Sequence, residues 1–318
     1  MKLETKRRRF RFSLRTLLIV VVVLAVPLGW IAKERRQSQR EQEIAEQLRE
    51  QGIHTVVFGG PYYESFSQGI AQGWWRNLAG QVLGDRVIGL EGADPHFKDL
   101  TALSGLRQLR DISLRSTQVG DLSPLCQLKN LHTLVLNNTQ VSDLSPLVAL
   151  TNLESLNLSK TQVNDLSALA GLKNLNSINL NDTLVSDLSP LINLANVKSL
   201  TLRNTPVSDL APLAGLVNLE SLELRQTHVN DLSPLANLAH LKGLDLNETP
   251  VNDLRPLAGL MNLQQLDLRK MHVSDLTPLM GLTKLTELAV TGTPVSKEQI
   301  ESIKNSLPNC QVLHDSFP

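Results

Sequence analysis

The stretch LHTLVLNNTQVSDLSPLVALTN, residues 131–152, recurs along the chain at a constant spacing of 22 residues. Self-similarity at a period of about 20–29 residues predicts a solenoid, because one unit cannot bury its apolar face without stacking on its neighbours. The repeat therefore directs attention to an extended surface and away from an enclosed catalytic pocket. Nine aspartates mark the spacing: Asp99, Asp121, Asp143, Asp165, Asp187, Asp209, Asp231, Asp253 and Asp275.

Each unit combines two apolar periodicities. Leu134 and Leu136 are two residues apart, which predicts a short strand with one side facing inward. Leu144, Leu147 and Leu150 are three apart, which suits a short helical or 3₁₀ turn. The pattern L-x-x-L-x-L-x-x-(N/C/T)-x-L is that of leucine-rich repeats. We predict an α/β leucine-rich-repeat solenoid with a curved parallel sheet, short helical or 3₁₀ turns on the convex side and an N-terminal transmembrane helix.

The element DLSPL, residues 143–147, carries the polar signals of the unit. Ser145 before Pro146 predicts an N-cap followed by the first helical position. Neighbouring aspartates on the grid would lie ~4.8 Å apart and repel one another by about 1 kcal/mol even in water. Either each carboxylate accepts N–H groups of its own turn, or the row binds cations. The chain lacks the G-G-x-G-x-D motif of calcium-binding repeats, which favours the first alternative.

Residues 99–296 resemble the 22-residue leucine-rich repeats of the internalin type, whose signature ends in D-[IL]-[ST]-P-L. The chain departs from that signature by placing Thr where internalin-type repeats usually carry Asn. The Thr column predicts hydroxyls that donate and accept at the strand-to-turn corner. It consists of Thr117, Thr139, Thr161, Thr183, Thr205, Thr227, Thr249 and Thr293.

Both ends of the repeat array depart from the pattern, as expected of capping units. We expect residues 52–98 to form an N-terminal cap with a first strand in VIGLEG, 87–92, and residues 297–318 to form a C-terminal cap with a helix over 297–306. Aromatic side chains of the N-terminal cap either pack against the first coil or form a patch for a partner. They are Tyr62, Tyr63, Phe66, Trp74 and Trp75.

Charge is distributed unevenly along the chain. Residues 1–50 carry 12 Lys/Arg and 6 Glu, whereas residues 51–318 carry 19 Lys/Arg and 25 Asp/Glu. We predict a basic cytoplasmic tail over 1–13, a transmembrane helix over 14–32, which spans ~28 Å, and a helical stalk over 33–51. The positive residues before the span place the N-terminus in the cytoplasm and the repeats outside the cytoplasmic membrane. A cleaved signal peptide is the alternative.

The combination of RFSLRTLL (residues 11–18), a short span, a charged stalk and Thr-type repeats resembles a group of bacterial membrane-anchored leucine-rich-repeat proteins, notably from planctomycetes. The resemblance implies architecture and location. No nucleophile elbow, P-loop, dinucleotide fingerprint or HExxH motif occurs, so we expect no enzyme, cofactor, metal site, nucleic acid or small-molecule substrate. Cys126 and Cys310 lie eight repeats apart, too far for a disulfide.

The outward strand positions remain as the candidate functional surface. Residues 99–296 contain no Phe, Tyr or Trp, so binding there is expected to be polar and sensitive to salt. We predict that the module mediates protein–protein contact through this face. The alternative is a passive structural or spacer element of the cell envelope without a specific ligand. The predicted partner-binding residues are Arg203, Glu223, Arg225, Asp245, Asp267 and Arg269.

Overall fold

The computed structural model describes residues 14–59 and 86–315, with the side chains of residues 14–28, 55, 58, 59, 86, 88 and 93 outside the description. The chain divides into two compact units. The first comprises Met1–Glu46 and Phe58–Val87, and the second comprises Gln47–Val57 and Ile88–Pro318. The repeats lie in the second unit, and the two units are described separately below.

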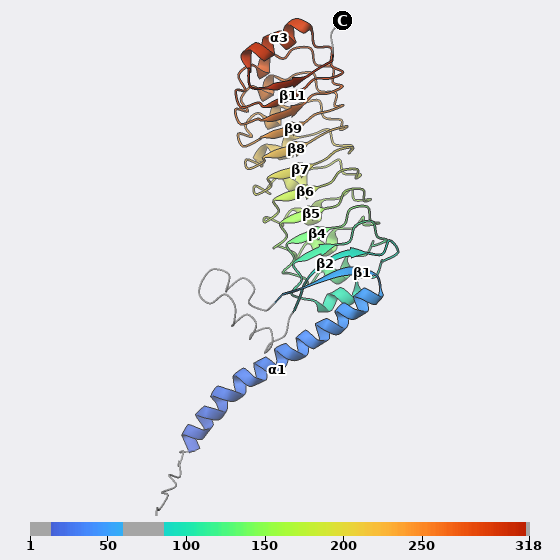
Figure 1. Ribbon diagram of the computed structural model, residues 1–318, viewed down its shortest axis with the longest axis vertical. Coiled ribbons are helices and arrows are strands. Elements are labelled where there is room, and N and C mark those ends of the chain that lie inside the picture. Colours follow the sequence, from blue (N-terminus) through green and yellow to red (C-terminus); the bar gives the residue numbers. More distant parts are fainter. Residues whose placement is uncertain (1–13, 60–85, 316–318) are drawn as a thin grey trace, which may run out of the picture. The chain divides into compact units, whose positions relative to one another are not determined.

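The second unit is a ladder of short strands and short turns (Figure 1). Two α-helices are described, α1 (Leu14–Glu50), most of which belongs to the first unit, and α3 (Lys297–Ser306). The strands are β1 (Ile53–Gly59), β2 (Arg86–Ala93), β3 (Asp111–Ser113), β4 (Thr133–Val135), β5 (Ser155–Asn157), β6 (Ser177–Asn179), β7 (Ser199–Thr201), β8 (Ser221–Glu223), β9 (Gly243–Asp245), β10 (Gln265–Asp267), β11 (Glu287–Ala289) and β12 (Gln311–Leu313). The 3₁₀ helices are η1 (Thr101–Gly105), η2 (Ser123–Leu125), η3 (Ser145–Leu147), η4 (Ser167–Leu169), η5 (Ser189–Leu191), η6 (Ala211–Gly215), η7 (Ser233–Leu235), η8 (Arg255–Leu257) and η9 (Thr277–Leu279).

All strands belong to one sheet in which spatial order follows chain order from β1 to β12. From β2 to β12 every neighbouring pair is parallel, and between β3 and β11 each residue faces the residue 22 positions later, as Leu134 faces Leu156. The predicted solenoid and its strand register are therefore confirmed. The predicted first strand lies within β2, whereas β1 was not predicted.

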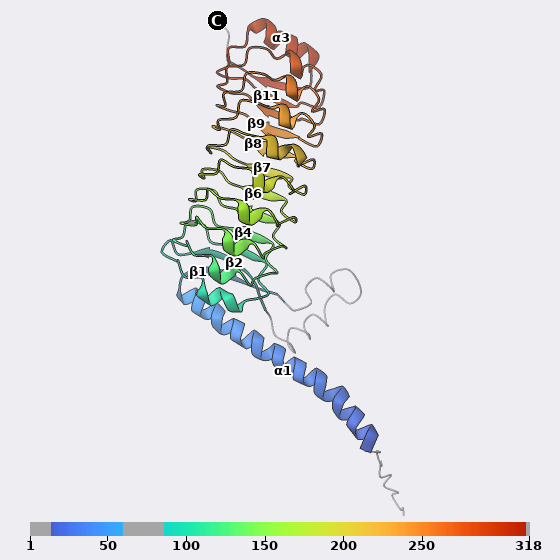
Figure 2. The ribbon, with the colours of Figure 1, turned by 180° about the vertical axis from the view of Figure 1, so that it is seen from behind.

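The interior is a continuous column of aliphatic side chains. In β3–β11 the middle residue of the strand and the apolar residue that follows the strand both point inward, as Leu156 and Leu158 do with no more than 1% exposure. Stacked coils share this interior, and burying one such side chain is worth about 1.5–3 kcal/mol before chain entropy is subtracted. The 3₁₀ helices lie on the face opposite the strands, as the view from behind shows (Figure 2).

The prediction that Ser caps each 3₁₀ helix is wrong. Ser145 is the first residue of η3, and the preceding Leu144 occupies the cap position without a side-chain hydrogen bond. The backbone N–H of Ser145 instead donates to Oδ1 of Asp143 over 2.8 Å. The carboxylate two residues upstream thus accepts the free N–H group that an N-cap Ser would otherwise have served.

Every aspartate of the column makes this same turn. In each of the nine repeats, the Asp Oδ1 atom accepts the backbone N–H of the residue two positions later over 2.8–2.9 Å. The first of the two sequence alternatives is therefore confirmed. Among the described residues, no group of three or more His, Cys, Asp or Glu side chains is arranged to hold a metal ion.

These hydrogen bonds lower the pKa of seven aspartates of the column. Beside Asp253, the guanidinium of Arg255 lowers the carboxyl pKa to about 2. At Asp165 the backbone N–H of Ser167 is the largest cause of the lowered pKa. A hydroxyl group two residues along the chain is the largest cause of a lowered pKa at Asp99, Asp121, Asp187, Asp231 and Asp275.

The lowered pKa values predict acid-sensitive folding. A carboxyl whose pKa is lower in the folded chain stabilises the fold above its unfolded pKa of about 4, and that contribution disappears as the pH falls through the folded value. The urea midpoint should therefore drop between about pH 4 and pH 2. In Asp187→Asn, which keeps an acceptor oxygen but loses the charge, the drop should be smaller. Equal drops in the two proteins would contradict this assignment.

Two further columns of side chains, one of Thr and one of Asn, donate hydrogen bonds to backbone carbonyl groups. Each Thr hydroxyl of the predicted column donates to the carbonyl oxygen three residues earlier over 2.6–3.1 Å, which confirms its place at the corner. A second column was not predicted: Nδ2 of an Asn donates to the backbone of the preceding coil, at Asn130, Asn152, Asn174, Asn196, Asn218 and Asn262.

The residue before each Thr has a left-handed backbone. Seven such residues other than glycine have φ between 53° and 58°, among them Lys160 with φ 56°, and Lys270 before Met271 has φ 57°. In the last coil the position belongs to Gly292 with φ 76°. L-residues pay a conformational cost there, so the stacked corners retain this backbone because the surrounding hydrogen bonds impose it. The N–H of Lys160, for example, donates to the carbonyl oxygen of Asn181 in the next coil over 2.8 Å.

The helix predicted near the C-terminus is described in full, whereas the predictions for the N-terminal region are described only in part. The helix predicted over 297–306 is α3, which Ser296 caps by accepting the N–H of Gln299. The N-terminal helix α1 runs without a break from Leu14 to Glu50 across the predicted span and stalk. Across residues 14–59 and 86–315, no helix has both the length and the apolar character needed to cross a membrane. The predicted tail (1–13) and the aromatic part of the cap (60–85) lie outside the described residues.

Candidate functional site

The six predicted site residues belong to two outward columns of the strand face. Strand register places Thr201, Glu223, Asp245 and Asp267 side by side on β7, β8, β9 and β10. Neighbouring parallel strands lie ~4.8 Å apart, so the last three form a line of adjacent carboxylates. Two residues further along each coil, the second column contains Arg203, Arg225, Asn247 and Arg269.

Asp267 and Arg269 neutralise one another. Nε of Arg269 donates to Oδ1 and Oδ2 of Asp267 over 2.9 and 2.8 Å, Nη2 also contacts Oδ2, and the backbone N–H of Arg269 donates to Oδ1 over 3.0 Å. The carboxylate of Asp267 raises the pKa of the Arg269 guanidinium. This bidentate pair is a charge-assisted contact with fixed geometry, so both charges are engaged within the chain.

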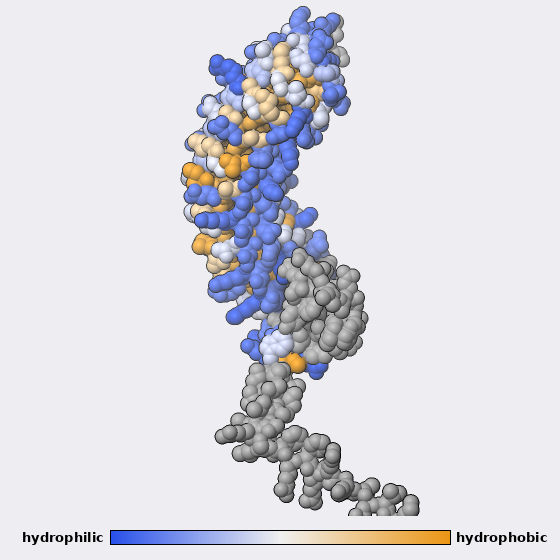
Figure 3. Space-filling model, turned by 90° about the vertical axis from the view of Figure 1, so that its left-hand side faces the viewer, coloured by the Kyte–Doolittle hydropathy of each residue, from blue (hydrophilic) through white to orange (hydrophobic). Residues whose placement is uncertain are grey.

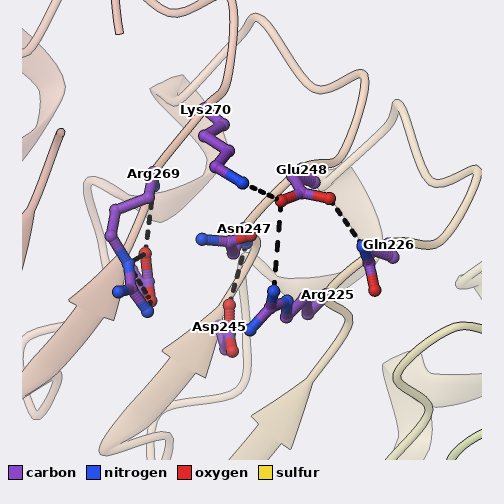
Figure 4. Close-up of polar contacts among 8 residues, drawn as sticks. Arg225, Gln226, Asp245, Asn247, Glu248, Arg269 and Lys270 are labelled. Atoms are coloured by element: carbon purple, nitrogen blue, oxygen red, sulfur yellow. Dashed lines mark hydrogen bonds and ion pairs between the residues drawn. The ribbon is translucent and has the colours of Figure 1, made fainter. Parts of the chain in front are cut away.

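Arg225 turns its guanidinium toward the corner of the coil (Figure 4). Its Nη2 atom lies 4.0 Å from Oε1 of Glu248. Glu248 also accepts Lys270 Nζ and Gln226 Nε2, both over 2.6 Å, and these hydrogen bonds lower the Glu248 pKa. Gln226, Glu248 and Lys270 were not predicted as part of the site. Their shared spacing of 22 residues was the available signal.

Asp245 has no salt bridge to its carboxylate among the described residues. Its Oδ1 accepts the backbone N–H of Asn247 over 2.8 Å. Burial is nevertheless the dominant influence and raises the Asp245 pKa, and the neighbouring Asp267 carboxylate adds to the shift. Within the described part of the chain, no side-chain hydrogen bond or salt bridge engages the carboxylate of Glu223 or the guanidinium of Arg203.

Buried polar atoms without a partner gather at this part of the face. Among the described side chains, three buried nitrogen or oxygen atoms have no hydrogen-bond partner: Thr201 Oγ1, Arg225 Nε and Asn247 Oδ1. All three belong to the two outward columns between β7 and β9. Buried polar atoms are nearly always hydrogen-bonded in native proteins, so this cluster distinguishes these coils from the rest of the described repeats.

The arrangement displays charge and hydrogen-bonding groups on an open surface. The structure therefore brings the predicted residues onto one face, but they differ in whether they have an ionic partner within the chain. Asp267 and Arg269 are paired internally, Arg225 is engaged by Glu248, and Glu223, Asp245 and Arg203 remain available. Such a face suits recognition of a polar partner through side chains.

Comparison with known proteins agrees with the geometry. Residues 96–149 and 151–193 match the family model described as leucine-rich repeats in two copies. An internalin C2 from Listeria monocytogenes has 34% identity and a TM-score of 0.55, with 59% of this chain and 82% of that chain covered. The chain is a leucine-rich-repeat protein. This repeat is typical of protein–protein interaction modules and of binding scaffolds without catalysis.

Two further solved structures are similar to this leucine-rich-repeat protein. An internalin from Listeria monocytogenes, inlF, has 31% identity and a TM-score of 0.68 over 71% of this chain and 66% of that chain. A leucine-rich-repeat protein of Leptospira interrogans has 25% identity and a TM-score of 0.65 over 68% of this chain and 58% of that chain. The chain thus spans less than two thirds of each of these two proteins. No curated protein matches it.

Proposed function

We propose that this leucine-rich-repeat protein is a membrane-tethered module that binds a protein partner on the outer side of the cytoplasmic membrane. The observation that carries the interaction is the line of outward charges over β7–β10, in which Glu223, Asp245 and Arg203 have no ionic partner of their own within the described chain. Unpaired surface charges of both signs favour encounter with a complementary polar surface.

The membrane location rests on the sequence of the N-terminal region. Residues 14–32 are almost entirely apolar and follow the basic run KRRRFRFSLR, residues 6–15. The resemblance to planctomycete membrane-anchored proteins supports the same location. We expect the full chain to stay in the membrane pellet after carbonate extraction and a chain lacking residues 1–32 to be released. Release of both forms would contradict the tether.

Charge reversal on the strand face tests the interaction. In the triple variant Glu223→Lys, Asp245→Lys and Asp267→Lys, the partner captured by the wild-type chain in cell extracts should be lost. The reason is that Lys at positions 223 and 245 replaces attraction by repulsion at the proposed contact, and Lys at position 267 leaves Arg269 without its carboxylate partner. Quantitative pull-down with equal amounts of folded protein measures the effect.

The control variant carries lysines on the opposite side of the solenoid, away from the strand face. Gln127, Asn193 and Asn237 are exposed near the 3₁₀ helices, and their replacement by Lys leaves the strand face unchanged. This control should capture the same partner as the wild-type chain. Retention of that partner by the strand-face triple variant would refute the proposed surface.

A structural spacer role is the second candidate, and one observation favours it. Large apolar side chains are exposed near the 3₁₀ helices, with Val148 57%, Ile192 52%, Val217 51% and Met261 54% exposed. Hydrophobic surface gathers along the left-hand outline of the space-filling view (Figure 3). Lateral association of the purified chain in sedimentation velocity, reversed by Ile192→Ser and Val217→Ser, would support the spacer role.

A further inference from the structure

We propose that the strand face over β7–β9 accepts a basic side chain, Lys or Arg, from an extended segment of a protein partner, with Glu223, Asp245 and Asn247 as its acceptors. This inference rests on the proposed function and adds the chemistry of the partner. It also narrows the contact surface to the middle of the charged line.

The first observation is the difference between neighbouring carboxylates. Asp267 is already bound by both Nε and Nη2 of Arg269, so it has little to offer a ligand. Asp245 accepts one backbone N–H and has no cation bonded to it, and Glu223 beside it has none within the described chain. A half-buried carboxylate next to a second carboxylate is stabilised when an external cation arrives. Two adjacent acceptors of the same charge favour a basic group.

The second observation is an unpaired acceptor beside these carboxylates. Asn247 has only 3% of its surface exposed, and its Oδ1 atom has no partner. In the close-up, Asn247 lies between Asp245 and Glu248 (Figure 4). An ammonium has three donors and a guanidinium has five, whereas neither has an acceptor. A basic side chain therefore matches a site formed by two carboxylates and an amide oxygen.

The two other unpaired atoms suit the backbone of the same segment. Arg225 Nε is a donor, and the Thr201 hydroxyl both donates and accepts. A peptide running along the face would present carbonyl oxygens to them once its basic side chain is bound. The adjacent outward column is small, with Ser221 and Gly243, and a Cβ atom on Gly243 would find its nearest neighbour, Ser221 Oγ, at 3.8 Å. Space is therefore open beside the carboxylates.

Recognition here must be through side chains. β7, β8 and β9 lie within the sheet and are paired on both sides, so a partner cannot add a strand at this point. A divalent metal ion is a poorer occupant because the described His, Cys, Asp and Glu side chains form no ligand group of three or more. An anionic segment is disfavoured beside Glu223 and Asp245 because these two adjacent carboxylates would repel it.

Side-chain NMR of the full chain tests the proposal directly. The Arg225 Nε–H and Asn247 Nδ2H₂ resonances are followed during titration with nine-residue Gly/Ser peptides whose central residue is Arg, Lys, Gln or Glu. We expect the Arg and Lys peptides to shift both resonances in a salt-sensitive manner, and the Gln and Glu peptides to leave them in place. Asp245→Asn and Glu223→Gln should each weaken binding by about tenfold or more.

Asp267→Asn is the matched control, because it removes a carboxylate that Arg269 already occupies. Its affinity for the Arg peptide should stay within about threefold of wild type. The proposal is overturned if the Gln or Glu peptide shifts the resonances equally, if calcium chloride alone reproduces the shifts, or if Asp267→Asn weakens binding as much as Asp245→Asn. Backbone amide spectra establish that each variant is folded.

Different results would refute the proposed interaction surface and the proposed basic side chain. Loss of the cellular partner in the charge-reversed triple variant, together with no response to basic peptides, would leave the interaction module standing and refute the basic side chain. Binding of basic peptides by a chain whose cellular partner survives the triple substitution would refute the proposed surface for that partner.

Discussion

Leu158→Ala is expected to lower the free energy of unfolding by about 2–5 kcal/mol. Leu158 follows β5 and is completely buried in the column of leucines that successive coils share. Truncation removes its contacts and leaves a cavity that the coils above and below cannot close, because their own leucines are fixed by the strand register. Urea unfolding followed by circular dichroism measures the change.

Ile192→Ala provides the control for this prediction. Ile192 is also an aliphatic residue of a repeat, but it is 52% exposed beside η5. Its truncation should change stability by no more than about 0.5 kcal/mol. An unchanged midpoint for Leu158→Ala, or equal losses in the two variants, would contradict the shared interior.

Lys160→Pro is expected to cost about 3 kcal/mol or more, although Lys160 is exposed. Its φ of 56° cannot be adopted by proline, whose ring holds φ near about −65°. Proline would also delete the N–H that donates to Asn181 in the next coil. Both effects act on the backbone, so the loss is independent of the lysine charge. The same urea experiment measures it.

Lys160→Gly separates the backbone effect from the loss of the side chain. Glycine adopts positive φ without a Cβ penalty and retains the N–H group. Stability should therefore stay unchanged or rise by up to about 1 kcal/mol. A large loss in Lys160→Gly would show that the lysine side chain, and not the left-handed corner, is what matters at this position.

The repeat made most of the fold predictable. A spacing of 22 residues fixed which side chains stack, and the two-residue and three-residue leucine spacings identified the strands and the 3₁₀ turns. The role of Asp143 and its equivalents also followed from sequence, because a short carboxylate reaches its own turn before it reaches anything else. These features are local or strictly periodic, so sequence position determines them.

Features that depend on side-chain direction were not predictable. The outward column showed that Asp267 and Arg269 would be close, but not that they would bond each other while no described side chain pairs with Glu223. The Glu248 network depends on a left-handed corner that turns its side chain toward Gln226 and Lys270. The strand β1 was missed because it lies in the capping region, where the repeat no longer constrains the pattern.

Site-specific photo-crosslinking in the native cell tests the central claim most directly, with the reactive group at Ser221 on the strand face or at the exposed Ala214 within η6. The account predicts one protein adduct from position 221, joined through a segment that contains Lys or Arg, and none from position 214. Adducts from position 214 alone, or an adduct at 221 that persists in the charge-reversed triple variant, would contradict it.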